Sequence, residues 1–158
     1  MNTSQILLWS FPIGLSLHVF EEFGFPGGFR QWIKAYNPRK LKSNTIYFIE
    51  NAAGIVAVCI IALKANDILG YRIYLYCVAG MAGNAASHIR GTIQKKQYCP
   101  GTVSGVLLLL PLFVISYGYF LEAGKVDLVS AIVCLGVGTF IGFYIFGVDI
   151  REKDRKKV

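Results

Sequence analysis

Five long apolar stretches, separated by short polar or charged segments, dominate the hydropathy pattern of the chain. Each stretch is close to the roughly 20 residues that an α-helix needs to cross a bilayer. The pattern predicts five membrane-spanning helices, at about residues 5–25, 45–63, 72–90, 102–120 and 128–148. We therefore expect an all-α fold, a polytopic membrane helical bundle that forms a single integral membrane domain over residues 1–158.

The connection between the first two stretches also has helical periodicity. Large apolar side chains recur there at i, i+3, i+4 and i+7, at Phe29, Trp32, Ile33 and Tyr36. This spacing favours a short interfacial helix that lies on the inner leaflet of the membrane. The alternative is an ordinary loop that carries aromatic residues of the membrane interface.

Composition supports the membrane assignment. Hydrophobic residues make up 54% of the chain, and the mean hydropathy is +0.51. The net charge of +7 does not indicate nucleic-acid binding, because the basic residues flank the apolar stretches. Charges in such places set membrane topology and contact anionic lipids of the inner leaflet.

The distribution of basic residues predicts the orientation. Thirteen of the sixteen lysines and arginines fall in the first connection, the third connection and the tail at residues 149–158. The opposite connections contain only Lys64, Arg72 and Lys125. Since cytoplasmic segments are enriched in lysine and arginine, we expect the N-terminus outside and the basic tail in the cytoplasm.

Small residues and cysteines add two structural expectations. Two GxxxG pairs, Gly101 with Gly105 and Gly138 with Gly142, allow close approach of helices. We favour packing within one chain over dimerisation, and the oligomeric state stays open. The four cysteines lack metal-knuckle or disulfide spacing and are expected to be free thiols.

A group of ionisable residues interrupts the first apolar stretch. His18, Glu21 and Glu22 stand at i, i+3 and i+4 and share one face of the predicted helix. Ionisable side chains at membrane depth are costly unless they pair, bind a metal or face a wet cavity. This face is therefore the strongest candidate for a functional site.

Further polar residues fall at the same predicted depth, near the cytoplasmic side. They are Glu50 and Asn51 in the second stretch, Asn84 and His88 in the third, and Tyr98 before the fourth. Taken singly, each has a plainer explanation, such as interfacial snorkelling for Glu50, interhelical hydrogen bonding for Asn84 or an interfacial position for Tyr98. Their common depth instead indicates one polar site.

The residue types in this site match metal chemistry. Imidazole and carboxylate ligands from separate helices suit iron, manganese or zinc, in a mononuclear or dinuclear centre. The expected ligands are His18, Glu21, Glu22, Glu50 and His88. Of these, His18, Glu21, Glu22 and Glu50 are the expected catalytic residues, and Asn51, Asn84 and Tyr98 the expected substrate contacts or supports of the ligands.

The function expected from this site is that of a membrane-embedded, metal-binding enzyme acting on a lipid-like or amphiphilic substrate. One alternative is a metal-free acid–base isomerase of a lipid or sterol-like substrate, in which a glutamate of raised pKa transfers the proton. Another is a proton-coupled transporter or a non-enzymatic assembly factor. The sequence contains no nucleotide-cofactor motif.

Three short motifs carry a family resemblance. His18-x-x-Glu21-Glu22, Asn84-x-x-x-His88 and Tyr98-x-Pro100-Gly101 occur in this order over roughly residues 14 to 111. In this the chain resembles the HXXEE family of small bacterial and archaeal membrane proteins. The resemblance implies a multi-pass protein of the prokaryotic cell (inner) membrane with a shared site, and no particular reaction.

Overall fold

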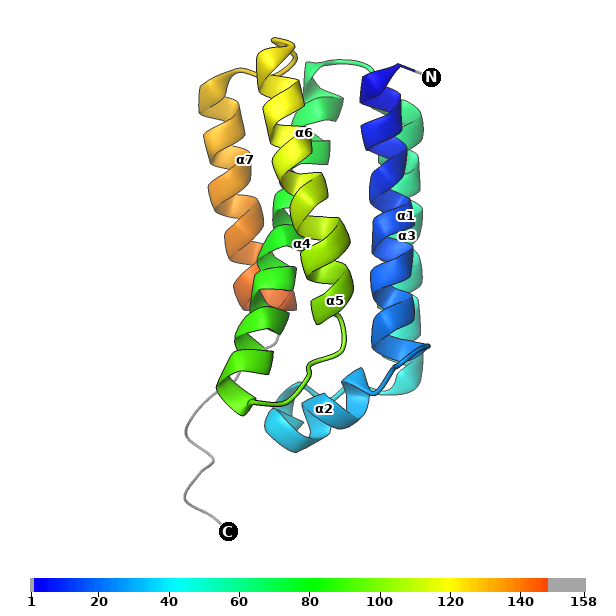
Figure 1. The fold of residues 1–158 in the computed structure, drawn as a ribbon. Coiled ribbons are helices and arrows are strands. Elements are labelled where there is room, and N and C mark those ends of the chain that lie inside the picture. Colours follow the sequence, from blue (N-terminus) through cyan, green and yellow to red (C-terminus); the bar gives the residue numbers. More distant parts are fainter. Residues whose placement is uncertain (1, 148–158) are drawn as a thin grey trace.

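The computed structural model describes residues 2–147, and all of its regular elements are helical. The expected tail at residues 149–158 and the last residue of the expected fifth span lie outside the described residues. Long helices run side by side between two ends of the bundle, and the short helix α2 crosses one end (Figure 1). The helices are α1 (Thr3–Phe23), α2 (Phe29–Tyr36), η1 (Pro38–Lys40), α3 (Asn44–Lys64), α4 (Ile68–Lys95), α5 (Thr102–Ser104), η2 (Gly105–Leu109), α6 (Leu110–Glu122), α7 (Leu128–Phe140) and η3 (Ile141–Phe146).

Local sequence sets the helix boundaries. At the N-caps of four long helices, a side-chain oxygen accepts a hydrogen bond from a backbone N–H of the first turn. These N-cap residues are Asn2, Ser43, Asp67 and Asp127. The segments α5, η2 and α6 follow one another without a break, and the wider π-helical turn of η2 lies directly before Pro111. Proline lacks the N–H that an α-helical turn requires, so the irregular turn falls where regular bonding is interrupted.

Within residues 2–147, four helical segments are long and apolar enough to cross a membrane: Thr3–Phe23, Asn44–Lys64, Thr102–Glu122 and Leu128–Ile145. These segments account for four of the five expected spans, with slightly different boundaries. The remaining stretch, expected at 72–90, is the longer helix α4. Its apolar run is interrupted by polar residues such as Asn84 and His88, and both of these side chains are buried.

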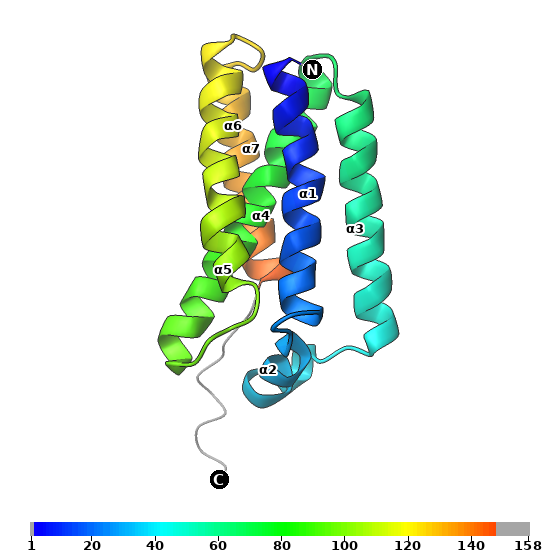
Figure 2. The ribbon, with the colours of Figure 1, turned by 45° about the vertical axis from the view of Figure 1, so that its right-hand side comes forward.

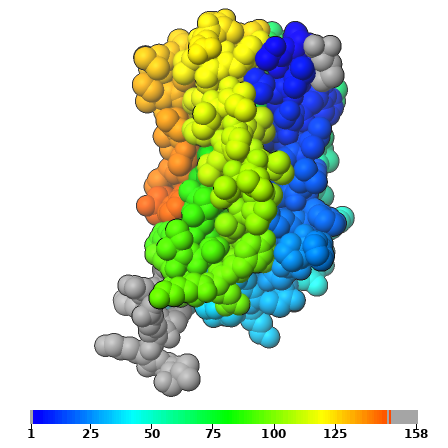
Figure 3. All heavy atoms as spheres, viewed as in Figure 1, coloured from blue at the N-terminus to red at the C-terminus, as the bar shows by residue number. Residues whose placement is uncertain are grey.

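Helix α4 lies at the centre of the bundle, and it contacts α3, α6 and α7. Tyr74 of α4 is fully buried among Leu8, Phe11 and Phe120. Its hydroxyl donates to the carbonyl of Leu7 over 2.9 Å and hydrogen-bonds Ser116 Oγ over 2.8 Å. One tyrosine thus links α1, α4 and α6, and the space-filling view shows α1 and α6 packed side by side (Figure 3).

The GxxxG pair of α7 and η3 packs within the chain. A Cβ on Gly142 would collide with the carbonyl of Gly80, and one on Gly138 would collide with the carbonyl of Tyr76. Both carbonyls belong to α4, so the absence of side chains lets the last helix lie directly on the central one. This is the intramolecular packing that the sequence favoured for this pair.

The short helix α2 occupies the connection where the apolar stripe predicted a helix. Its stripe faces the protein: Phe29, Trp32 and Ile33 are buried in a small cluster with Cys99. The loop between α4 and α5 supplies this surface. The helix therefore covers the end of the bundle with its apolar face turned toward the chain itself.

The close contact between α4 and α7 gives a test of the packing. We expect Gly138→Ala to lower stability by about 1–3 kcal/mol, because overpacking moves one helix away from the other. Gly136→Ala, on the same helix, is the matched control, since a Cβ there meets nothing within 4 Å. Thermal unfolding in a mild detergent should show a lower Tm for Gly138→Ala and no loss for Gly136→Ala. Equal Tm values for the two variants would contradict the packing.

Candidate functional site

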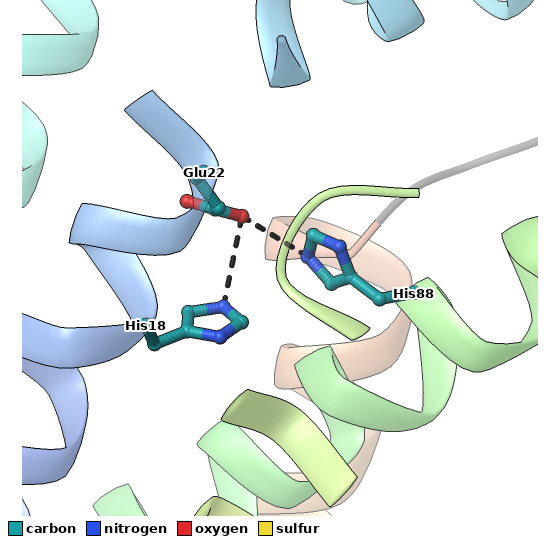
Figure 4. A group of neighbouring side chains, drawn as sticks. All are labelled: His18, Glu22 and His88. Atoms are coloured by element: carbon teal, nitrogen blue, oxygen red, sulfur yellow. Dashed lines mark ion pairs between the residues drawn. The ribbon is translucent and has the colours of Figure 1, made fainter. Parts of the chain in front are cut away.

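Three buried side chains converge between α1 and α4. His18 and Glu22 stand one turn apart on α1, and His88 approaches them from α4 (Figure 4). Glu22 Oε1 lies 3.1 Å from His88 Nε2 and 3.6 Å from His18 Nε2. The exposed fractions of His18, Glu22 and His88 are 2%, 7% and 0%. Two imidazoles therefore face the same carboxylate oxygen away from bulk water.

The far side of each imidazole is held by the segment around α5. His18 Nδ1 lies 2.8 Å from Ser104 Oγ, and His88 Nδ1 lies 3.4 Å from Cys99 Sγ. Ser104 Oγ also lies 3.5 Å from the carbonyl oxygen of Gly101, and Cys99 Sγ lies 3.8 Å from the carbonyl oxygen of Pro100. Burial, followed by the charges of Glu22 and Glu21, raises the pKa of the Cys99 thiol, so the thiol keeps its proton.

These contacts favour one tautomer of each ring. If Ser104 and Cys99 donate their own protons to acceptor oxygens, each accepts the Nδ1 proton of its histidine. The Nε2 atoms of His18 and His88 then present lone pairs, and neither atom has a hydrogen-bond partner within the described residues. Two lone pairs and a carboxylate oxygen repel one another unless a cation lies between them. The group can hold a metal ion or a shared proton.

The distances suit a metal ion. The three ligand atoms lie within 4.8 Å of one another. Ligands about 2.0–2.2 Å from a zinc ion are roughly 3.3 Å apart in a tetrahedral site, which is close to the 3.1 and 3.6 Å between Glu22 Oε1 and the two Nε2 atoms. Metal-bound histidines commonly donate their other ring N–H to a neighbouring group, and here Ser104 Oγ and Cys99 Sγ lie beside the two Nδ1 atoms.

Gly101 lets the α5 segment approach both rings. Its φ of +99° lies in the left-handed region that favours glycine. A Cβ at this position would lie 2.8 Å from the His88 ring and 2.9 Å from the His18 ring. The two rings meet edge to face with centroids 5.3 Å apart. Glycine is therefore required where the chain closes over the pair.

Glu21 holds this segment in place. Its Oε1 accepts the N–H groups of Gly101 and Val103, at 2.9 and 3.0 Å, and its Oε2 accepts that of Ser104 at 2.6 Å. Helix α5 has no side-chain cap of its own, so a carboxylate from α1 takes that role. The hydroxyl of Tyr98 also donates to Glu21. Burial, then the hydrogen bond and charge of Glu21, raise the pKa of Tyr98, which keeps the phenol a donor.

The other expected residues take different positions. Glu50 is exposed and forms an ion pair with Lys42, with Nζ and Oε1 2.6 Å apart, so it stands outside the three-residue group. Asn51 and Glu22 both line one cavity. Asn84 is buried one turn before His88 and interacts with His18. Of the expected ligands, the structure thus brings together His18, Glu22 and His88, while Glu21 binds backbone.

Sequence reasoning did not single out Ser104 or Cys99 as partners of the histidines. Cys99 lies inside the Tyr98-x-Pro100-Gly101 motif, which was a signal for its position. Ser104 was marked only by being a polar residue within an apolar stretch. Both depend on where a segment some 80 residues from His18 folds back, and no local pattern encodes that.

Two further features surround the group. The Phe29 ring of α2 lies 5.4 Å from the His88 ring and covers it from the end of the bundle. A cavity of about 560 Å³ lies between α1, α2 and α3, and Glu22 is among its lining residues. The buried group therefore borders a space large enough for a small molecule.

Comparison with known proteins places the chain in a family. The family model described as "Protein of unknown function with HXXEE motif" matches residues 9–116. No curated protein and no solved structure matches the chain.

The role of Glu21 gives a prediction on stability. Glu21→Gln should lower the free energy of unfolding by about 1.5–3 kcal/mol, because an amide cannot accept all of the backbone N–H groups that the carboxylate accepts. Glu50→Gln should change it by less than about 1 kcal/mol, since an exposed ion pair contributes little. Thermal unfolding of both variants in the same detergent measures the difference. An equal Tm for the two variants would contradict this role of Glu21.

Proposed function

Because this chain belongs to the family of proteins of unknown function with the HXXEE motif, we propose its function from the geometry. It is a membrane-embedded enzyme whose metal ion is held by His18, Glu22 and His88. The observation that carries the proposal is the convergence on one carboxylate oxygen of two Nε2 atoms that have no hydrogen-bond partner among the described residues. The Ser104 and Cys99 contacts support it, since they orient both rings from behind.

The donor set narrows the choice of metal. Two histidines and one carboxylate are a set used by zinc hydrolases and by non-haem iron enzymes. We propose a mononuclear site for iron, manganese or zinc. Glu21 and Glu50 are left out of the ligand set, because Glu21 binds the backbone of residues 101–104 and Glu50 pairs with Lys42.

Three protein ligands favour catalysis over a purely structural role. Structural zinc sites close their coordination with four protein ligands, whereas catalytic sites keep one position for water or substrate. A bound metal ion would supply Lewis acidity or an activated water. The cavity beside Glu22 opens among apolar and polar side chains, which supports a lipid-like or amphiphilic substrate.

We also propose that α4 crosses the membrane, which gives five spans with the N-terminus outside. The basic residues of the first connection and the last turns of α4 lie at the α2 end of the bundle, while Lys64, Arg72 and Lys125 lie at the other (Figure 1). This asymmetry supports a cytoplasmic α2 end and a cell-membrane location. The low hydropathy of α4 is consistent with a span whose neighbours are other helices.

The orientation can be tested with single cysteines in a variant whose four native cysteines are replaced. A cysteine at Lys125 should react with a membrane-impermeant maleimide in intact cells. A cysteine at Lys34, on the exposed face of α2, should react only after the cells are opened. Labelling of Lys34→Cys in intact cells would contradict the orientation.

Metal content is the direct test of the proposed centre. Protein purified in mild detergent should contain about one iron, manganese or zinc ion per chain by elemental mass spectrometry. Both His88→Ala and Glu22→Gln should lose it, because each removes a ligand atom that no neighbouring residue replaces.

Glu50→Gln is the matched control and should retain the metal, since Glu50 stands outside the group. A wild-type protein without metal, even after incubation with all three ions, would overturn the proposal. The shared proton would then be the cation between the imidazoles and Glu22, and acid–base isomerisation would be the function to pursue.

A further inference from the structure

The cavity beside Glu22 lies between α1, α2 and the first half of α3. The buried residues of α3 are Val58 and Ala62, both in its second half. No residue in its first half is buried, and residues of both α1 and α3 line the space between them. Figure 2 shows α3 at the edge of the molecule, beside α1 and with α2 below.

The walls of this cavity are amphipathic. Apolar side chains of α1 and α3, including Val19, Phe48 and Ile55, form one part. Phe48 is 74% exposed, so this part opens toward the outer surface of the bundle. The polar part consists of three amide side chains and the single arginine of the lining: Gln31, Asn44, Asn51 and Arg30.

Arg30 carries a charge that no acidic residue offsets within the part of the chain that the structure describes. Its Nε donates to the carbonyl of Lys42 at 3.4 Å, and no ion pair involves its guanidinium. The nearby carboxylate of Glu50 is occupied by Lys42. A guanidinium binds planar or tetrahedral oxyanions through two parallel N–H bonds.

We propose that the juxtaposition of Arg30, the amide side chains and the apolar wall forms a binding site for a single-chain lipid with an oxyanion head, either carboxylate or phosphate. The head binds Arg30 and the amides, between α2 and the proposed metal centre, and the chain lies along Phe48 and Ile55. The volume of about 560 Å³ suits one small amphiphile. This inference rests on the proposed function and names its substrate class.

Charge supports the orientation of the ligand. Glu22 is the one acidic residue of the lining, and its Oε1 already faces two imidazoles. With a divalent ion bound, the centre of two neutral histidines and one carboxylate has a net positive charge. An oxyanion then lies between two cationic points, and a cationic head is repelled by both.

Binding is tested by native mass spectrometry of the protein in a neutral detergent. Dodecyl phosphate and dodecanoate are the probes, and dodecyltrimethylammonium has the same chain with the opposite charge. We expect one dodecyl phosphate or dodecanoate per chain and no specific binding of the cation. Arg30→Gln should weaken binding of both anions about tenfold or more, because a charge-assisted bidentate contact is lost.

Two further variants separate the contribution of the Arg30 charge from that of the apolar wall. Arg39→Gln removes an exposed arginine of the same connection that does not line the cavity, and it should bind as the wild type does. Ile55→Trp fills the apolar part and should weaken binding of both anions without changing the Tm by more than a few degrees. Unchanged binding in Arg30→Gln, or equal binding of the cation, would overturn the proposal.

Inorganic phosphate distinguishes a lipid from a soluble anion. It should bind far more weakly than dodecyl phosphate, and equal affinity would overturn the lipid assignment. The titrations are run on chelator-treated and on metal-loaded protein. Arg30-dependent binding that persists in protein without any metal would sustain the lipid site while the metal centre fails, so the two failures are distinguishable.

Discussion

The candidate site depends on one interaction, the binding of the Glu21 carboxylate to the backbone N–H groups of Gly101, Val103 and Ser104. A carboxylate in an apolar bundle is stable only where donors satisfy it, and the uncapped start of α5 provides three. The same contact fixes where the chain re-enters the bundle. Ser104 and Cys99 are thereby brought behind the two histidines. The geometry of the proposed metal ligands is thus set by a residue that is not one of them.

Two consecutive glutamates have different roles because a helix turns about 100° per residue. Glu21 points toward the start of α5, and Glu22 points toward His18 and His88. The two carboxylates have different neighbours: backbone N–H groups satisfy Glu21, whereas Glu22 faces the two imidazoles. On one turn of α1, Glu21 therefore stabilises the structure, and Glu22 is a candidate metal ligand.

The helical class and the meeting of His18, Glu22 and His88 at one depth could be predicted, since both follow from period and position within apolar stretches. The separate roles of Glu21 and Glu22 could not, because i+3 and i+4 both share a face with His18 and the deciding donors lie some 80 residues away. The position of Glu50 outside the site could not be predicted for a similar reason. Its partner Lys42 precedes the helix, and a hydropathy pattern does not predict such an ion pair. The sequence also could not predict that the apolar stripe of α2 faces the protein, because this depends on where the loop around Cys99 lies.

The cost of burying this group argues that it serves a ligand. A buried carboxylate that faces two imidazoles contributes less to folding than apolar side chains of similar size would. Packing alone would be better served by the surrounding small and aliphatic residues, which already join α4 to its neighbours. A cation between Nε2 of both rings and Oε1 of Glu22 would turn the repulsion among these atoms into attraction. Its binding would draw α1 and α4 together, and the adjoining cavity would give the proposed substrate access to the same carboxylate.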